Sequence, residues 1–280
     1  MFLFPDSFVA SLLEEDLHIL DLTSQALGLS DQPAQVRAVA RAASVAAGVE
    51  VAQRLFQLVG AEVTVQAPSG QVLRSGETLL VARGSVGNLH GAYKIAQNVL
   101  EYCGGVATRA RLMVDQARGV SAAEVLVTRK HFPGAKRLSL AAALAGGAQI
   151  HRVGLSDSIL IFDQHSQFLG GVEGLVKALP GVKSKYLEKK IAVEVANLAE
   201  AELVARAGAD VIQCEKFVES DLRLAVQKVR AINPLVKILA AGGVNGDNAA
   251  ALAATGVDGL VTSWPYFGKP QDVKMEFSDL

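Results

Sequence analysis

The pattern of hydrophobic and polar residues changes at about residue 120, which indicates two different kinds of domain. Upstream of that point, helix-like and strand-like patterns are mixed. Residues 33–59 are rich in alanine and carry apolar side chains at helical spacing, which predicts two helices that meet near Gly48.

Strand-like segments and a long helix follow in the same N-terminal part. Residues 61–67 and 71–84 alternate apolar and polar side chains, and a Pro-Ser-Gly turn sequence separates them. A helical pattern then runs from about Val86 to Arg118. We therefore predict a mixed α+β domain over residues 1–107.

From about residue 120, short β-branched runs alternate with helical segments. Six runs have this strand-like character: 124–130, 158–165, 190–197, 209–216, 236–243 and 258–264. Regular alternation of strands and helices predicts βαβ units and a parallel sheet. No glycine-rich nucleotide fingerprint opens the series, which favours an α/β barrel over an open doubly wound sheet. We place this barrel domain at residues 108–265.

Composition narrows the class of protein further. The chain has 27 Lys and Arg against 28 Asp and Glu, so a nucleic-acid partner is not expected. Its two cysteines match no metal-ligand spacing and are typical of reduced thiols in a cytoplasmic protein. The first residues do not resemble a signal peptide, and no long uncharged apolar stretch predicts a membrane span.

Polar residues interrupt the apolar runs where the predicted strands end. They are Thr128, Arg129, Lys130, Asp163, His165, Glu194 and Glu215. In α/β barrels the working residues lie at the carboxyl ends of the strands, so closure of the barrel would gather these side chains at one mouth. Polar residues also end strands that have no function, but cations and carboxylates after four strands in turn favour a site.

Two later strand ends indicate a phosphate site. Gly242 and Gly243 follow one predicted strand, and Ser263 follows the next. A glycine pair lets backbone N–H groups approach a phosphate, which barrels often bind after their last strands. A glycine pair after a strand is also common in simple turns.

Together these groups suit a polyanionic substrate. Arg129, Lys130 and Arg152 would bind anions, and Glu194 with Glu215 would hold a magnesium ion. Phosphoribosyl pyrophosphate is one such substrate. An enzyme acting on it would mainly position the reactants and stabilise an oxocarbenium-like centre.

The order and spacing of these residues resemble a known family. Its central signature is matched by residues 127–130, by Gly146-Gly147 and by the run from His151 to Asp157. These segments resemble quinolinate phosphoribosyltransferases, and the likeness covers nearly the whole chain. It implies an incomplete, TIM-like α/β barrel preceded by an α+β sandwich domain, with the tail from about residue 266 to 280 packed back on that domain. It also implies a homodimer with shared active sites, and leaves open whether dimers associate further.

The resemblance also implies roles for individual residues. Arg129, His151 and Arg152 would face the carboxylates of the acceptor, and Lys130 would lie near the acceptor and the phosphoribosyl donor. Glu194 and Glu215 would serve the ribose and magnesium. Gly242 and Gly243 would hold phosphate.

Departures from the family pattern fall at the acceptor side. Phe162 stands where the family has a lysine, and Tyr93-Lys94 stand where it lends a Glu-Arg pair across the dimer interface. Glu215-Lys216 replace its Asp-Asn. Losing a pocket lysine removes a charge-assisted partner worth about 1.5–3 kcal/mol, and lysine lacks the planar fork of arginine. This pattern resembles the ModD branch of the family, whose genes accompany molybdate transport.

Three functions follow as hypotheses. The first is a magnesium-dependent pyrophosphorylase that transfers phosphoribosyl to a nitrogenous or aromatic-acid acceptor, with a link to molybdenum utilisation. The second is an authentic carboxylating nicotinate-nucleotide pyrophosphorylase that uses quinolinate. The third is a non-catalytic protein that binds a phosphorylated ligand.

Overall fold

A computed structural model describes residues 2–280 and divides the chain into two compact units. The first unit contains the residues up to Arg111 together with Phe132–Gly147 and Pro265–Leu280. The second unit contains Leu112–His131 and Ala148–Trp264. No helix within residues 2–280 is both long and apolar enough to cross a membrane.

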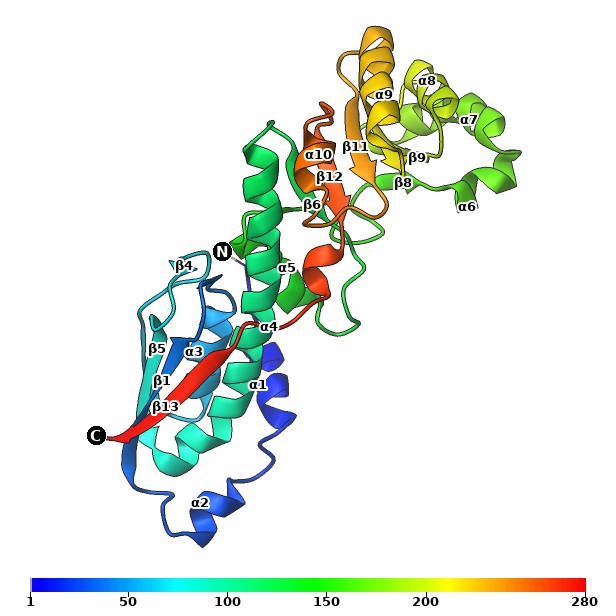
Figure 1. The fold of residues 1–280 in the computed structure, drawn as a ribbon. Coiled ribbons are helices and arrows are strands. Elements are labelled where there is room, and N and C mark those ends of the chain that lie inside the picture. Colours follow the sequence, from blue (N-terminus) through cyan, green and yellow to red (C-terminus); the bar gives the residue numbers. More distant parts are fainter. Residues whose placement is uncertain (1) are drawn as a thin grey trace. The chain divides into compact units, whose positions relative to one another are not determined.

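The first unit is built on a four-stranded sheet in the order β13-β1-β5-β3. All its pairings are antiparallel, and Figure 1 shows the C-terminal strand β13 lying beside β1. The strands are β1 (Pro33–Ala40), β2 (Ser44–Val45), β3 (Glu62–Val65), β4 (Val72–Leu73), β5 (Thr78–Ser85) and β13 (Val273–Asp279). The helices are α1 (Asp6–Glu14), α2 (Leu22–Ala26), α3 (Val49–Leu58), α5 (Lys136–Ala145) and α4 (Val86–Arg118), whose last turns lie in the second unit.

The helix predicted over the first half of residues 33–59 is wrong. Residues 33–40 form strand β1, which pairs on one side with β5 and on the other with β13. Both partners come from distant parts of the chain, so pairing in the tertiary structure outweighs the helical spacing of the alanines. The predicted strands around residues 62–85 and the helix 86–118 are confirmed.

Gly48 does not join two helices but begins helix α3. Its φ of 74° is left-handed, and a Cβ there would lie 2.9 Å from Val99 Cγ1 and 3.0 Å from Cys103 Sγ. Glycine is therefore required both for the backbone conformation and for the close packing of α3 against α4.

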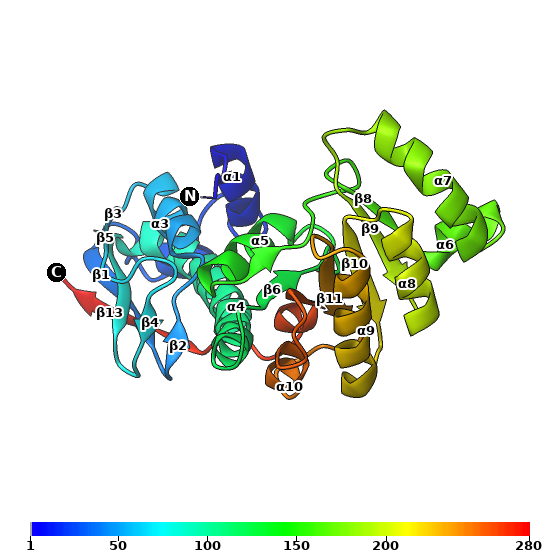
Figure 2. The ribbon, with the colours of Figure 1, turned by 90° about the horizontal axis from the view of Figure 1, so that it is seen from above.

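The second unit contains a seven-stranded sheet in the order β7-β6-β12-β11-β10-β9-β8. Every pairing in it is parallel, as the βαβ rhythm predicts. The strands are β6 (Glu124–Val127), β7 (Gln149–Ile150), β8 (Ile159–Ile161), β9 (Ile191–Val195), β10 (Val211–Glu215), β11 (Lys237–Ala241) and β12 (Gly259–Thr262). Helices α6 (Asp163–Ser166), α7 (Val172–Lys185), α8 (Leu198–Arg206), α9 (Glu219–Ile232) and α10 (Ala249–Ala253) connect them; α8 and α9 lie side by side (Figure 2).

The barrel is incomplete because β7 and β8 are the two edges of the sheet. Residues 151–158 connect these strands without a helix. Inside the curved sheet, Leu239, Ala241 and Val261 form a buried cluster. The incomplete α/β barrel with a separate α+β domain therefore confirms the predicted fold class.

Carboxylates fix the register at the amino ends of the strands. Asp210 accepts a hydrogen bond from the N–H of Ile191 at 2.9 Å, and Asp258 accepts one from the N–H of Ile238 at 2.9 Å. Each bond links the loop before one strand to the first residues of its neighbour. The carboxyl ends of the strands are consequently held in step with one another.

Candidate active site

The predicted site residues of the second unit all lie at the carboxyl ends of its strands or directly after them. Because the sheet is parallel throughout, these ends form a single edge. Arg129 and Lys130 follow β6, His151 and Arg152 follow β7, and Phe162 follows β8. Glu194 is the last residue but one of β9, and Glu215 ends β10. Gly242 and Gly243 follow β11, and Ser263 follows β12.

Arg152 and Phe162 are in contact at the mouth of the barrel. The guanidinium carbon of Arg152 lies 5.8 Å from the centre of the Phe162 ring, within the range of a cation–π contact. Arg152 is buried, with 6% of its surface exposed. One residue follows the edge strand β7 and the other follows the edge strand β8, so the contact joins the segments that leave the two open edges of the sheet.

His165 holds Phe162 in this position. Its Nδ1 accepts a hydrogen bond from the N–H of Phe162 at 3.1 Å, and the two rings stack with centres 5.9 Å apart. The interaction caps the start of α6. The structure thus gives His165 the capping role that a histidine after a strand often has.

The basic side chains affect one another. Burial lowers the pKa of His151, and the charges of Arg152 and Arg129 lower it further. His151 is therefore a neutral imidazole at pH 7, able to donate or accept a hydrogen bond. Of these three side chains, the two arginines carry the permanent positive charge.

The titration of His151 gives a testable pH dependence. Because its pKa in the folded protein lies below the usual 6.5, its contribution to stability is present above pH 6.5 and is lost as the pH falls through the folded value. We expect His151→Gln to lose less stability than the wild type between pH 7 and pH 5. Urea unfolding at the two pH values measures this difference; equal losses in both proteins would contradict it.

The carboxylate of Glu194 lies in an unfavourable environment for a negative charge. Burial raises its pKa, and the nearby carboxylate of Glu215 raises it further, while a hydrogen bond from Gln213 and the charge of Lys130 oppose the rise. Gln213 Nε2 donates to Glu194 Oε2 at 2.7 Å. Two carboxylates that repel each other beside a lysine form an arrangement that a divalent cation would relieve.

Gln213 was missed by the sequence analysis because it lies within an apolar strand. It is 4% exposed, and its Oε1 is buried with no hydrogen-bond partner among residues 2–280. This polar side chain lies in the barrel interior although its amide oxygen has no hydrogen-bond donor. Its contact with Glu194 is the reason that the structure offers.

Replacing Gln213 by methionine should separate stability from activity. We expect the free energy of unfolding to change by no more than about 1 kcal/mol, because removal of the unsatisfied acceptor offsets the hydrogen bond that Glu194 loses. Turnover should fall about ten-fold because Glu194 loses its donor. Gln116→Met is the matched control: Gln116 also has a buried unpaired Oε1 but lies on helix α4, so its variant should gain stability without losing turnover. A Gln213→Met protein with full activity would contradict the prediction.

Gly242 and Gly243 form a turn with two successive left-handed residues, at φ values of 82° and 75°. A Cβ at Gly242 would lie 2.6 Å from Glu215 Oε1, whereas nothing lies within 4 Å of the corresponding point at Gly243. Gly243 itself is exposed. The turn is thus open and suited to an anion.

Two asparagines that the sequence analysis did not single out stabilise this turn. Asn245 and Asn248 each donate from Nδ2 to the carbonyl of Gly243, at 3.2 and 3.0 Å. Thr262 Oγ1 donates to the carbonyl of Val244 at 2.7 Å. The carbonyl groups of Gly243 and Val244 are therefore occupied by side-chain donors of the same turn.

Lys94 belongs to the first unit and is exposed on helix α4. Its Nζ donates to Gln97 Oε1 at 2.8 Å and lies 5.3 Å from the centre of the Tyr93 ring. Its role at a neighbouring subunit stays a prediction.

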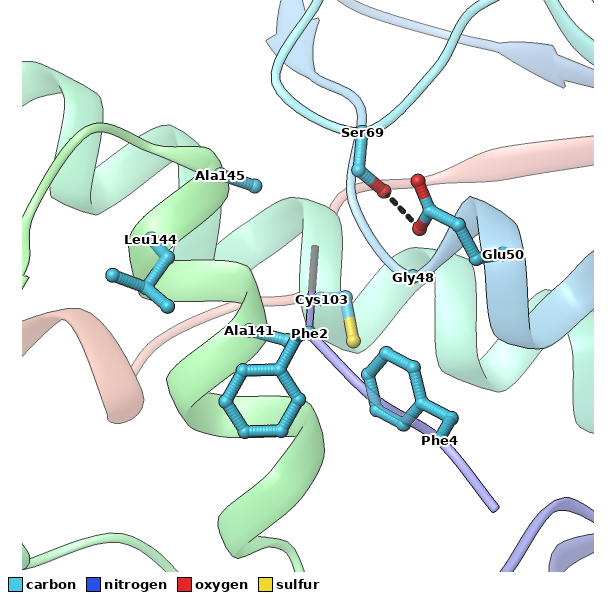
Figure 3. Close-up of a pocket in the computed structure, with 9 residues that line it drawn as sticks. All are labelled: Phe2, Phe4, Gly48, Glu50, Ser69, Cys103, Ala141, Leu144 and Ala145. Atoms are coloured by element: carbon cyan, nitrogen blue, oxygen red, sulfur yellow. Dashed lines mark hydrogen bonds between the residues drawn. The ribbon is translucent and has the colours of Figure 1, made fainter. Parts of the chain in front are cut away.

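A cavity of about 370 Å³ also lies in the first unit, and none of the predicted site residues lines it. Figure 3 shows Phe2 and Phe4 on one side, Cys103 between helices, and the Ser69 hydroxyl donating to Glu50 at 2.6 Å. Burial raises the pKa of the Cys103 thiol to about 12, so that thiol is an unreactive packing group.

The carboxylate pair cannot enclose a metal alone. Within residues 2–280, no three His, Cys, Asp or Glu side chains are grouped to hold a metal ion. Magnesium commonly binds through one or two carboxylates together with water and substrate phosphates. Glu194 and Glu215 fit that manner of binding, in which the substrate supplies the remaining oxygens.

An incomplete parallel α/β barrel with this mouth is the architecture of the type II phosphoribosyltransferases, which are pentosyltransferase enzymes. The chain belongs to the quinolinate phosphoribosyl transferase family: residues 106–276 match its C-terminal domain and residues 21–103 its N-terminal domain.

Relatives with two different names resemble the chain. ModD of Rhodobacter capsulatus, named as a pyrophosphorylase, is 40% identical over 259 residues, which cover 91% of this chain and 98% of that protein. The carboxylating nicotinate-nucleotide pyrophosphorylase of Mycobacterium leprae is 33% identical over 253 residues, covering 89% and 88%. The structure of the nicotinate-nucleotide pyrophosphorylase from Francisella tularensis superposes with a TM-score of 0.90 at 25% identity, covering 99% and 98%.

Proposed function

We propose that this enzyme transfers the phosphoribosyl group of phosphoribosyl pyrophosphate to a nitrogenous or aromatic-acid acceptor other than quinolinate. The bond from the ribose C1 to the diphosphate oxygen breaks, a bond from the acceptor nitrogen to C1 forms, and pyrophosphate leaves. Membership of the family and the groups gathered at the mouth of the barrel support this reaction.

The protein's own residues would stabilise charge and hold the reactants. Glu194 and Glu215 carry the negative charge that favours an oxocarbenium-like ribose, and they would hold magnesium, which neutralises the diphosphate. Lys130, close enough to affect the pKa of Glu194, would bind the donor or the leaving group. Gly242, Gly243 and Ser263 would bind a phosphate through their backbone N–H groups.

The contact between Arg152 and Phe162 carries the argument about the acceptor. Where the family pattern has a lysine, this mouth has an aromatic ring whose face already lies beside the buried guanidinium. Arg129 and Arg152 remain as permanent cations, and His151 is neutral. The acceptor side therefore suits a flat ring with fewer carboxylates than quinolinate, which is a dicarboxylate.

Two alternatives remain tied to specific observations. The names of the Mycobacterium leprae and Francisella tularensis relatives favour the carboxylating reaction with quinolinate. A non-catalytic protein that binds a phosphorylated ligand would need the glycine turn but not the two carboxylates that repel each other.

The likeness to ModD is the support for a link to molybdenum utilisation.

Release of pyrophosphate from phosphoribosyl pyrophosphate and magnesium tests the proposal. We expect release with a monocarboxylate or neutral nitrogen base, and little with quinolinate. Phe162→Lys should shift the preference towards quinolinate, whereas Phe162→Leu, which removes the ring without adding a charge, should not. Preferred use of quinolinate by the wild type would refute our choice of acceptor. No release of pyrophosphate with any acceptor would favour a binding protein.

A homodimer with shared sites is part of the same proposal. In it, Lys94 reaches the site of the partner subunit, which the exposure of its side chain allows. Mixed dimers formed from Lys94→Ala and Glu194→Gln chains test this sharing. One site in such a dimer would keep both residues, so activity should return on mixing; no recovery would place Lys94 outside the partner's site.

A further inference from the structure

Lys216 has a backbone conformation that lysine rarely adopts. It follows Glu215 at the end of β10, and its φ of 57° makes it the one non-glycine residue with positive φ among residues 2–280. For a residue with a Cβ, this left-handed conformation is strained. The N–H of Lys216 donates to the carbonyl of Ala241 at 2.7 Å, which fixes the conformation against the neighbouring strand.

This conformation directs the side chain across the glycine turn. A Cβ at Gly242 would lie 2.5 Å from Lys216 Cγ, so the stem of the lysine occupies the space that a side chain at residue 242 would need. Gly243, next along the turn, faces open space. Lys216 is itself exposed, so its flexible stem can carry the ammonium group to the open side of the turn.

We infer that Lys216 is a phosphate-binding residue of this site, and that its left-handed backbone serves to bring its ammonium group to the Gly242–Gly243 turn. The inference rests on the proposed function. A phosphate on the turn would receive N–H groups from the backbone and a full positive charge from Lys216. Relative to the family pattern, Phe162 removes a cation from the acceptor side of the site, and Lys216 adds one to the phosphate side.

The ligand is a phosphate group of the donor, either its 5-phosphate or its diphosphate. Calorimetric titration with ribose 5-phosphate and, separately, with inorganic pyrophosphate plus magnesium distinguishes the two. We expect Lys216→Asn to weaken binding about ten-fold or more in one of these titrations, the usual effect of losing a charge-assisted bond. Asparagine tolerates the left-handed conformation, so the fold is preserved.

Three further variants identify the cause of the loss. Lys216→Gly relieves the strain and should weaken binding as much as Lys216→Asn while raising the melting temperature of the ligand-free protein. Lys216→Arg keeps the charge and should bind within about three-fold of the wild type. Lys177→Asn, which removes an exposed lysine of helix α7, should bind like the wild type.

The outcomes separate this inference from the proposed function. Unchanged affinity of Lys216→Asn and Lys216→Gly in both titrations would overturn the role of Lys216 and leave the transferase proposal standing. A loss in Lys216→Arg as large as in Lys216→Asn would also overturn it, because charge would then not be the cause. A wild-type protein that binds neither ligand would overturn the phosphate site and the inference together.

Discussion

Replacing Glu194 by glutamine is expected to lower turnover about 10²–10³-fold while making the protein more stable. The loss follows because the carboxylate would no longer balance the charge that develops on the ribose or help to hold magnesium. The gain follows because burial and Glu215 both disfavour the ionised form of Glu194, as its raised pKa indicates. Glutamine retains an oxygen to accept the hydrogen bond from Gln213.

The gain in stability should depend on pH in a defined direction. Because the pKa of Glu194 in the folded protein is raised above 4.5, the protonated form is favoured, and the associated stability is lost as the pH rises through the folded value. The difference in stability between Glu194→Gln and the wild type should therefore be largest near pH 7 and shrink as the pH falls toward 4.5. Chemical unfolding across this range measures it.

Two controls make the result specific. Glu215→Gln should show the same loss of turnover, since it removes the other carboxylate of the pair. Glu219→Gln, in the exposed first turn of α9, should leave turnover unchanged. If Glu194→Gln weakens ligand binding while no turnover is detectable even in the wild type, the non-catalytic reading is correct.

The carboxyl edge of the barrel was predictable because its signals are local. Each apolar run ends in a polar residue, and parallel strands carry those ends to one side, so Glu194 and Glu215 could be paired from the sequence alone. The meeting of Arg152 with Phe162 was not predictable in this way. It depends on the path of residues 153–161 between the two side chains, which the packing of the whole unit determines.

Strand β1, Gln213 and Lys216 show three other limits of prediction from the sequence. Residues 33–40 become a strand because segments about 40 and 240 positions further along the chain pair with them, and a local pattern contains no trace of those partners. Gln213 occupies an inward position of the apolar strand β10. Its partner Glu194 lies on the neighbouring strand β9, so the local sequence does not show the contact. The left-handed backbone of Lys216 has no local signature, since lysine does not favour it.

Gly146→Ala is expected to cause the largest loss of stability among the substitutions considered. Gly146 ends helix α5, and a Cβ there would lie 2.4 Å from the carbonyl oxygen of Ala107 and 2.7 Å from Ala110 Cβ, both on α4. The obstacle is backbone, so the two helices would have to separate. Overpacking of this kind costs about 3 kcal/mol, or a fall of several degrees in melting temperature.

Separation of the helices would also disturb a hydrogen bond. Arg111 Nε donates to the carbonyl of Gly146 at 3.0 Å, and that bond depends on the same close approach. Gly146→Ser should behave like Gly146→Ala, because the obstacle is met by any Cβ whatever side chain follows it.

Gly154→Ala is the matched control for this loss. Gly154 belongs to the same resemblance to the family signature, but nothing lies within 4 Å of the point where its Cβ would be. Its replacement should leave the melting temperature unchanged or raise it slightly, because alanine restricts the unfolded chain. Equal falls in melting temperature in both variants would mean that helix packing is not the cause. A fall in Gly146→Ala alone identifies the contact between α4 and α5 as the reason that residue 146 is glycine.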